Sequence, residues 1–421
     1  MLVGLVVPGL PRPLAEEHLD ELARLVETAG GVVVGRGLQE RAKPDPATVV
    51  GRGFLQQLGS RCEDEAAESV VFDEDLTASQ VRNIEGELPK SLKILDRAAV
   101  ILDIFAQRAR SREAQTQVEL AQLSYLLPRL TRRWRHLSRQ AGGIGTRGVG
   151  ETQLEIDRRL ISRRMAQLRG KLAVIERDRR LRRERRIDLP TVALVGYTNA
   201  GKSSLFRRLT RAAVLVEDRL FATLDPRARR AALGEEVTAV LTDTVGFIRK
   251  LPHDLVAPFR STLEEAVDAD LVLHVVDAAH QAWEEHLRVG EEVLEGLGVE
   301  REQTLVVFNK TDLLQSRCYP TMEPRGVSVA LSAATGKGVA ELKERVRAML
   351  LSAPGVAILR VPLEEPEMVR RAVGLPHQLA RRFMDEAVEL AMRVDPRLLV
   401  EAGLDLYRVP GWNTLSGKGG G

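Results

Sequence analysis

Cysteines and long apolar runs are scarce in this sequence of 421 residues. Cys62 and Cys318 lie far apart and have no companion histidines, which excludes a disulfide framework and a zinc motif. No stretch approaches the roughly 20 apolar residues that cross a bilayer. The first residues lack the basic start and apolar core of a secretory signal. We therefore expect a cytoplasmic, monomeric protein without a membrane span.

Histidine is also sparse, and the seven histidines form no metal-binding spacing. His274 lies inside an apolar stretch, so we expect it to be a core residue. No Ser/His/Asp or Cys/His constellation is present in the sequence.

The net charge of +3 is small, but it is distributed unevenly. From Gln107 to Ile187 there are 22 basic residues, all but one arginine, against 8 acidic residues. This segment carries +14, so the rest of the chain carries −11. A single basic segment in an otherwise acidic protein predicts a polyanionic partner.

Residues 1–106 predict a small α/β domain. An apolar strand, Leu2–Val7, precedes an amphipathic helix over Glu16–Thr28. Further short strands are expected at Gly31–Val34, Val49–Val50 and Val70–Phe72, with a strand running into a helix over 95–105.

Two heptad seams lie within residues 107–189 and predict an antiparallel helical hairpin, kinked at Pro128. Between them, residues 138–153 are too rich in glycine to be helical and form the predicted flexible, RNA-binding tip. The seam positions are Leu120, Leu123, Leu127, Leu130, Trp134 and Leu137, and then Leu154, Ile161, Met165, Leu168, Leu172 and Ile175.

Residues 190–352 alternate between strands and helices, as in a doubly wound, mostly parallel sheet. Residues 353–421 predict a small C-terminal domain with one strand, Ala357–Val361, and a flexible glycine-rich tail. The strands expected in 190–352 are Thr191–Val195, Val237–Thr242, Leu271–Asp277, Thr304–Phe308 and Val327–Leu331.

The segment Gly196–Ser203 follows an apolar strand and opens a helix, which is the context of a P-loop. Backbone amides of such a loop hold phosphates. Lys202 would contact the β- and γ-phosphates, and the Ser203 hydroxyl would coordinate Mg²⁺. The predicted phosphate-binding residues are Gly196, Tyr197, Thr198, Asn199, Ala200, Gly201, Lys202, Ser203 and Ser204.

Asn309, Lys310 and Asp312 end a later strand in the N-K-x-D pattern. The Asp312 carboxylate can accept the N1 and N2 protons of guanine, a donor pair that adenine lacks. Asn309 would brace the loop, and the Lys310 stem would lie along the base. Ser332-Ala333, after the last strand, would offer a backbone amide to the guanine oxygen. The predicted guanine-binding residues are Asn309, Lys310, Asp312, Ser332, Ala333 and Ala334.

Asp243–Gly246 closes another strand in the D-x-x-G pattern. Asp243 would hold Mg²⁺ through a water, and the Gly246 amide would meet the γ-phosphate. Thr223 is the predicted switch threonine that completes magnesium coordination, although Thr198, Thr210 and Thr238 are alternatives. The predicted switch residues are Phe221, Ala222, Thr223, Leu224, Asp225, Asp243, Thr244, Val245, Gly246 and Phe247.

Phe247 stands where many GTPases carry a water-orienting glutamine. A phenyl ring can neither orient nor deprotonate water, so hydrolysis needs another source of charge. One hypothesis is that Asn199 ligates K⁺ against the phosphates, which would neutralise transition-state charge; the alternative is that Asn199 stabilises the loop. We predict intrinsic turnover below about 1 s⁻¹, accelerated by a partner.

The arginine-rich hairpin suits phosphates and base planes, so folded RNA is the expected partner. The alternative is a solvated coiled coil that docks a protein. A membrane surface is disfavoured, because the seam residues are committed to helix pairing. The predicted RNA contacts are Arg139, Gly142, Gly143, Gly145, Thr146 and Arg147.

With these residues in view, the sequence closely resembles the HflX family of ribosome-associated GTPases. The family also carries Phe at the position of Phe247. Val149 departs from the family pattern, where Pro is common, and Arg227-Ala228 stands where Thr-Thr is usual. The most specific matching segments are 101–110, 118–123, 142–155, 196–203, 221–226 and 243–249.

The resemblance implies binding to the large ribosomal subunit near the peptidyl transferase centre, with the glycine-rich tip contacting ribosomal RNA. It also implies splitting or rescue of stalled ribosomes under stress, with GTP hydrolysis permitting release, and it supports Thr223 as the switch residue. Two other readings remain open. One is a tRNA-modification GTPase, which would need a further catalytic module. The other is a GTP-switched regulator that binds RNA or protein away from the ribosome.

Overall fold

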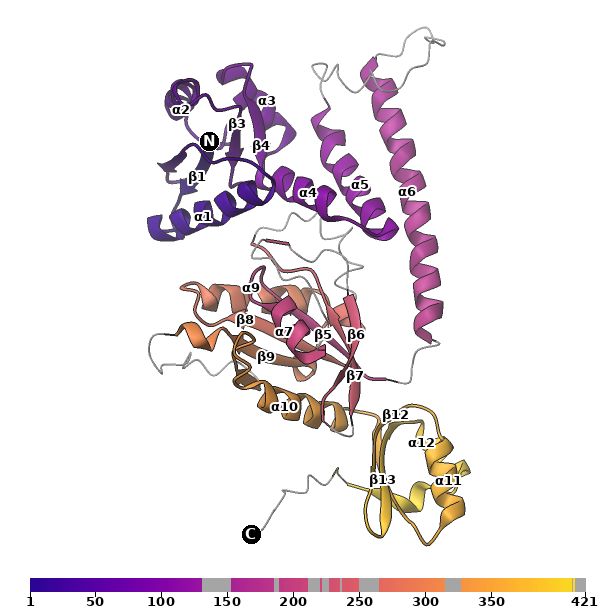
Figure 1. The fold of residues 1–421 in the computed structure, drawn as a ribbon. Helices are drawn as coiled ribbons and strands as arrows, with labels where there is room; N and C mark the ends of the chain where they lie inside the picture. The colour runs from indigo at the N-terminus through magenta and orange to yellow at the C-terminus, as the bar shows by residue number, and fades with distance from the viewer. Residues whose placement is uncertain are drawn as a thin grey trace. The chain divides into compact units, whose positions relative to one another are not determined.

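The computed structural model describes residues 1–130, 153–184, 189–210, 220–221, 227–234, 237–249, 265–314, 327–410 and 412. These residues form two compact units. The first contains the residues up to 177 together with Leu220 and Phe221, and the second contains the rest. Their helices and strands are labelled in Figure 1. None of the described helices is long and apolar enough to span a membrane.

The first unit contains a four-stranded parallel sheet in the order β2-β1-β3-β4. Helices α2 and α3 cover one face, and α1 packs against β1 on the other. Strands covered on both sides are apolar throughout, as in β1, where every residue is buried. The elements are β1 (Leu2–Val6), α1 (Arg12–Thr28), β2 (Arg36–Glu40), α2 (Arg52–Asp64), β3 (Ser69–Phe72), α3 (Ala78–Glu87), β4 (Lys93–Asp96) and α4 (Arg97–Arg108).

Two of the strands predicted for this domain are wrong. Gly31–Val34 is irregular, because Gly30 (φ 93°) and Gly31 end α1: the Gly31 amide donates to Val26 O over 2.8 Å. Val49–Val50 lies in a tight loop, since Val49 has φ 66° and exchanges two backbone hydrogen bonds with Asp45. The other predicted strands, the helix over Glu16–Thr28 and the strand running into a helix over 95–105 are confirmed.

The predicted antiparallel hairpin is formed by α5 (Arg112–Leu126) and α6 (Gln153–Glu184), which lie side by side (Figure 1). Helix α5 ends in a 3₁₀ turn, η1 (Leu127–Arg129), because Pro128 cannot donate the next helical hydrogen bond. Trp134, Leu137 and the predicted tip up to residue 152 lie outside the described residues. The described seam consists of Leu120, Leu123, Leu127, Ile161, Met165, Leu168 and Leu172.

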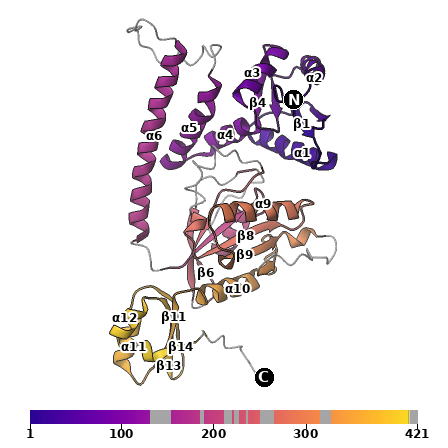
Figure 2. The same ribbon diagram turned by 180° about the vertical axis from the view of Figure 1, so that it is seen from behind.

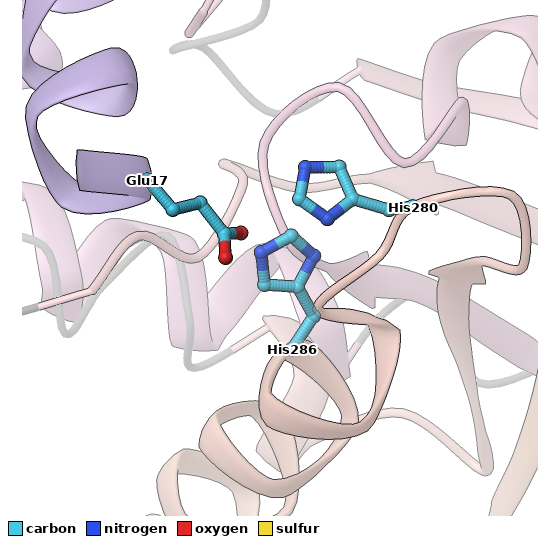
Figure 3. Close-up of side chains that lie close together, drawn as sticks. All are labelled: Glu17, His280 and His286. Carbon is cyan, nitrogen blue, oxygen red and sulfur yellow. The ribbon is translucent and has the colours of Figure 1, made fainter. Parts of the chain in front are cut away.

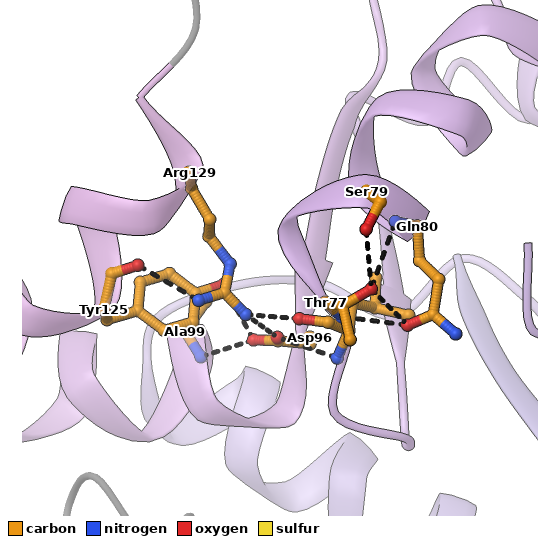
Figure 4. A network of polar contacts seen from close by, with 8 residues as sticks. Thr77, Ser79, Gln80, Asp96, Ala99, Tyr125 and Arg129 are labelled. Atoms are coloured by element: carbon orange, nitrogen blue, oxygen red, sulfur yellow. Dashed lines mark hydrogen bonds and ion pairs between the residues drawn. The ribbon is translucent and has the colours of Figure 1, made fainter. Parts of the chain in front are cut away.

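A polar network fastens the end of α5 to the N-terminal sheet (Figure 4). Asp96 caps α4, accepting from the Ala99 amide over 2.9 Å. The buried Asp96 carboxylate also accepts from Leu76 N at 3.2 Å, the Tyr125 hydroxyl at 2.8 Å and an Arg129 Nη at 3.0 Å. Burial, and then the charge of Asp96, raise the pKa of Tyr125. Helix α5, and α6 as far as Arg177, belong to the same compact unit as the sheet.

The second unit contains a six-stranded sheet in the order β10-β9-β8-β5-β7-β6. It is parallel except for β6, which runs antiparallel to β7 and has no counterpart among the predicted strands. Helices α7 and α10 cover one face and α9 the other. The elements are β5 (Thr191–Gly196), α7 (Lys202–Thr210), β6 (Arg227–Ala232), β7 (Thr238–Asp243), β8 (Leu271–Asp277), α9 (Trp283–Gly296), η3 (Arg301–Gln303), β9 (Thr304–Asn309), η4 (Thr311–Leu313), β10 (Ser328–Ala330) and α10 (Val339–Leu351).

The C-terminal part is an antiparallel sheet in the order β12-β13-β11-β14, with α11 and α12 on one face (Figure 2). Ile358, Ala380 and Ala391 on the other face belong to the core that includes α10. Of its strands only β11 was predicted. The α/β fold class is confirmed. The elements are β11 (Val356–Pro362), α11 (Pro366–Gly374), β12 (Gln378–Phe383), β13 (Ala387–Arg393), α12 (Pro396–Glu401), η5 (Asp405–Tyr407) and β14 (Arg408–Val409).

Candidate nucleotide-binding site

The loop between β5 and α7 has the backbone geometry of a phosphate cradle. Gly196, Asn199 and Gly201 have φ values of 142°, 61° and 91°. A Cβ on Gly196 would lie 2.1 Å from Val275 O, and one on Gly201 would lie 2.2 Å from Asn309 Nδ2. Only glycine fits these two positions, because both need positive φ and close contact. The loop leads directly into α7, so its amides and the helix N-terminus form one anion site.

Lys202, the first residue of α7, is buried at the base of this loop. Its Nζ donates to Gly196 O at 2.9 Å and to Tyr197 O at 2.8 Å. Burial lowers the pKa of Lys202 to about 8, and the nearby Asp243 carboxylate opposes the shift. A buried ammonium is stabilised by negative charge, which a bound phosphate would add.

Ser203 and Asp243 meet beside the lysine. The Ser203 hydroxyl donates to Asp243 Oδ2 over 2.8 Å, and Asp243 is fully buried at the end of β7. Hydroxyl and carboxylate oxygens are ligands that Mg²⁺ prefers. The pair fits a magnesium ion held between the P-loop helix and β7. Ser204, next on α7, is partly buried.

The backbone after Asp243 is hydrogen-bonded to the P-loop. Phe247 N donates to Gly196 O at 2.9 Å, and Thr198 N donates to Phe247 O at 2.7 Å. A Cβ on Gly246 would lie 2.9 Å from Lys202 Nζ. The predicted Asp243–Phe247 segment and the P-loop therefore adjoin. Within this segment the Thr244 hydroxyl donates to Leu194 O, and Val245 is buried.

The Phe247 side chain is buried, and its ring lies edge-on to His274 with 6.4 Å between centroids. His274 is fully buried, as predicted, and neither ring nitrogen has a hydrogen-bond partner among the described residues. Burial, and then the charge of Lys202, lower the pKa of His274 to about 4. The imidazole is therefore neutral. It fits only because residue 290 is glycine, where a Cβ would lie 2.1 Å from Nε2.

Tyr197 makes contacts that the sequence did not indicate. Its hydroxyl accepts from the Arg249 amide over 2.9 Å. Its ring stacks on His286 at 3.8 Å, and His286 lies beside His280 at 4.4 Å (Figure 3). Arg249 and the two histidines come from two parts of the chain that are distant from Tyr197 in the sequence, so no local pattern predicts these contacts.

The predicted guanine-binding residues also converge. Asn309 Nδ2 donates to Ala200 O at 2.9 Å, and Asn309 Oδ1 accepts from Ala333 N at 2.9 Å. Asn309 thus joins the P-loop to the turn after β10. Lys310 adopts φ 63° and forms a 2.7 Å ion pair with Asp277, while Asp312 stays exposed in η4. Ser332 and Ala334 belong to the same turn as Ala333.

The remaining predicted residues lie in the first unit or outside the described residues. Phe221 is buried in the first unit, where its ring lies edge-on to Phe105 at 4.7 Å. Residues Ala222, Thr223, Leu224 and Asp225 lie outside the described residues, as do the predicted RNA contacts Arg139, Gly142, Gly143, Gly145, Thr146 and Arg147. The switch threonine and the RNA contacts therefore stay predictions.

Three family profiles match the chain in succession. One described as "GTP-binding GTPase N-terminal" covers residues 16–106. One described as "GTP-binding GTPase Middle Region" covers 108–186. The third, described as "50S ribosome-binding GTPase", covers 191–310. Together they span most of the chain.

Curated relatives match over nearly the same length. The GTPase HflX of Magnetococcus marinus is 47% identical over 364 residues, covering 86% of this chain and 83% of the relative. The GTPase HflX of Escherichia coli K12 is 43% identical over 383 residues, covering 90% and 89%. A solved GTP-binding protein from Sulfolobus solfataricus in complex with GDP is 25% identical, with a TM-score of 0.43, and the match covers 83% of this chain and 98% of that one. On its sequence identity to these relatives, the chain belongs to the HflX family of GTPases.

Proposed function

We propose that this GTPase binds the large ribosomal subunit and acts on stalled or idle ribosomes, splitting or rescuing them under stress. GTP hydrolysis permits its release. The observation that carries the nucleotide-dependent part of the proposal is the convergence of Lys202, Ser203, Asp243 and Asn309 at one edge of the mostly parallel sheet. The net charge of +14 on residues 107–187 and the 50S-binding description of the matched profile support the ribosome as partner.

The nucleotide is held at its two ends. Lys202 and the loop amides from Gly196 to Ser204 bind the phosphates, and Asp312 accepts the N1 and N2 protons of guanine. Ser203 and Asp243, together with Thr223, would hold Mg²⁺, which when bound neutralises charge on the β- and γ-phosphates. Asn309 fixes the distance between the two ends because it is hydrogen-bonded to both loops.

Hydrolysis is slow without a partner, because Phe247 offers the attacking water no hydrogen-bonding group. Its buried ring and its backbone bonds to the P-loop hold Gly246 against Lys202 instead. The Asn199 side chain is exposed on the loop. It is the candidate for a K⁺ ligand, which would supply transition-state charge that the glutamine-less site lacks.

Contact with RNA is assigned to the glycine-rich tip, at Arg139, Gly142, Gly143, Gly145, Thr146 and Arg147. The leucine seam of α5 and α6 and the Glu119–Arg164 ion pair, at 2.6 Å and 2.8 Å, give the tip a paired-helix stem. Because the paired helices constrain both ends of the tip, the tip should lose less conformational entropy when it binds RNA.

The decisive experiment is steady-state GTP hydrolysis with and without purified large ribosomal subunits, in K⁺ and in Na⁺ buffers. Stimulation by subunits is the expected result, and a lower rate in Na⁺ would assign a cation to Asn199. Absence of stimulation in both buffers would refute the ribosome assignment. A basal rate above about 1 s⁻¹ would refute slow intrinsic turnover.

The alternative is a GTP-switched regulator that binds RNA or protein away from the ribosome. Salt dependence separates a polyanion from a protein partner. Binding through arginine–phosphate contacts weakens steeply as salt rises, because condensed counterions are released. Binding through the apolar seam would change little. A flat salt dependence of partner binding would therefore favour the protein-binding alternative.

A further inference from the structure

Arg208, in the last turn of α7, is hydrogen-bonded to the turn that follows β10. Its Nε donates to Ala333 O at 3.1 Å, and one Nη donates to Ala334 O. The guanidinium also lies over Gly336, where a Cβ would be 3.4 Å from the other Nη and where φ is 92°. One planar side chain thus bonds two residues of the turn and lies against a third position.

The base of this side chain is rigid. Leu205, Phe206 and Leu209 on either side of Arg208 are buried in the main core of the second unit. The turn itself is closed by backbone bonds, from Gly336 N to Ser332 O at 2.8 Å and from Ser332 N to Lys337 O at 2.9 Å. Arg208 therefore connects two well-packed elements more than 120 residues apart in the chain.

The two carbonyls fix the direction of two amides. In a planar trans peptide the C=O and the following N–H point in opposite directions. Holding Ala333 O against Arg208 therefore turns the Ala334 N–H away from it, and holding Ala334 O does the same for Thr335 N–H. Ala333 N already donates to Asn309 Oδ1. Thr335 N already donates to Ser332 Oγ at 3.1 Å. Of the two amides that Arg208 orients, the Ala334 N–H is therefore the one with no hydrogen-bond acceptor among the described residues.

We propose that Arg208 is a positioning residue for guanine recognition: it orients the Ala334 amide toward the guanine O6 and so slows nucleotide release. A guanidinium suits this task because its fork donates to two oxygens at once, which a lysine ammonium on a flexible stem does not. Arg208 does not touch the nucleotide. It acts through the turn.

The test compares R208M, R208K and R207M with the unchanged protein. Arg207 is the matched control, since it is the adjacent arginine, is exposed, and has no hydrogen bond or ion pair among the described residues. Affinities are measured for GDP, for inosine diphosphate, which keeps O6, and for 6-thio-GDP, whose sulfur is a weaker acceptor. Release of a fluorescent GDP is timed by stopped flow.

R208M should weaken GDP and inosine diphosphate by up to about tenfold, because the neutral hydrogen bond from the Ala334 amide to O6 is lost, and it should speed release by a similar factor. It should weaken 6-thio-GDP less than about threefold, because that bond is already poor. R208K should fall between R208M and the unchanged protein, and R207M should leave all three affinities unchanged. The thermal unfolding midpoint of each nucleotide-free variant checks that it is folded. If R208M does not fold, the same affinities and release rates are compared between R208K and the unchanged protein.

Equal weakening of GDP and 6-thio-GDP would overturn the proposal, because it would mean a general loosening of the site. So would an equal effect of R207M, or no effect of R208M. The inference rests on the assignment of guanine to Asp312 and residues 332–334 made above. That assignment fails separately, if the unchanged protein binds ADP as tightly as GDP.

Discussion

Gly290 and His274 face each other across the contact between α9 and β8, where the imidazole occupies the space of a missing side chain. In an exposed helix, replacing glycine with alanine stabilises by up to about 1 kcal/mol. Here the added Cβ would sit 2.1 Å from His274 Nε2, so steric overlap outweighs helix propensity.

Gly290→Ala should therefore lower the free energy of unfolding by about 2 kcal/mol, through overpacking. In a His274→Ala background the same change should stabilise. Urea unfolding followed by tryptophan fluorescence measures both. Gly170→Ala in α6, where a Cβ meets nothing within 4 Å, is the control and should stabilise. A destabilising Gly290→Ala in both backgrounds would contradict the assigned overlap.

His274 also makes stability depend on pH. Its pKa is about 4 when folded and near 6.5 when unfolded, so the unfolded chain binds more protons between these values. The contribution of neutral His274 to the free energy of unfolding is therefore fully present above pH 6.5 and is lost as the pH falls toward 4. At pH 5 the loss should be about 2 kcal/mol relative to pH 7.5.

His274→Gln should remove this part of the pH dependence, because a glutamine amide does not titrate. The measurement is the difference in unfolding free energy between the two proteins at pH 7.5 and pH 5. Val272→Ala, on the same face of β8, is the control and should cost the same at both pH values. Parallel pH profiles for His274→Gln and the unchanged protein would refute the assignment.

Motif residues could be predicted one by one because each motif is local and its spacing is imposed by the ligand. Gly196, Lys202 and Asp243 lie where the pattern put them. Arg208 and the Tyr197–Arg249 contact could not be predicted. Their partners are fixed by tertiary packing, and an arginine on a helix surface has no distinguishing neighbour in sequence.

At the scale of elements, helix α5 is held by two different kinds of contact. Its leucine seam packs on α6, while Tyr125 and Arg129 at its far end bind the Asp96 carboxylate. Arg129 also stacks on the Tyr125 ring, 3.6 Å from its centroid. The buried carboxylate depends on these donors, since burial of an unpaired charge is costly.

Tyr125→Phe should destabilise the α4–α5 region by about 2 kcal/mol, the value of a hydrogen bond to a charged group. Amide hydrogen exchange across residues 97–126 should then be roughly thirtyfold faster. Tyr407→Phe is the matched control, since the hydroxyl of Tyr407 bonds Glu365 at an exposed site. In the Tyr407→Phe protein, amide exchange around residue 407 should change far less. Equal effects would show that the Asp96 network contributes little.

Elements with a regular apolar period were predictable, and those built by tertiary pairing were not. Leu271–Val276 is apolar except for His274, because it is covered on both faces. Strand β6 has the sequence Arg-Ala-Arg-Arg-Ala-Ala, and Ala231 is its one buried residue. It therefore lacks the alternation of apolar and polar residues that would predict a strand. Gly31–Val34 was wrongly predicted as a strand, because its three consecutive valines have high strand propensity. They directly follow the glycines that end α1.

At the scale of the whole molecule, the nucleotide-binding sheet and the C-terminal sheet share one core. Ile358 and Ala391 pack with Leu342 and Val346 of α10, and Arg393 forms an ion pair with Asp270 at the edge. We expect the buried apolar contacts of Ile358 to contribute more to stability than the Arg393–Asp270 ion pair, because exposed ion pairs contribute only about 0–1 kcal/mol.

Ile358→Ala should therefore loosen the C-terminal sheet by about 2–5 kcal/mol, whereas Arg393→Met should have little effect. Limited proteolysis around Ser352–Gly355, between the two sheets, reports the difference. Faster cleavage of the Ile358 variant is expected, with the Arg393 variant close to the unchanged protein. The reverse order would mean that the ion pair holds the two sheets together.

The Asp96 network has a consequence for the order in which the chain is made. Asp96 is synthesised 29 residues before Tyr125 and 33 before Arg129. A nascent chain that has emerged only as far as α4 can pair this carboxylate with Leu76 and Ala99 alone. The N-terminal sheet therefore acquires the hydrogen bonds from Tyr125 and Arg129 only after the first helix of the hairpin has left the translating ribosome. Until then the Asp96 carboxylate lacks two of its four donors.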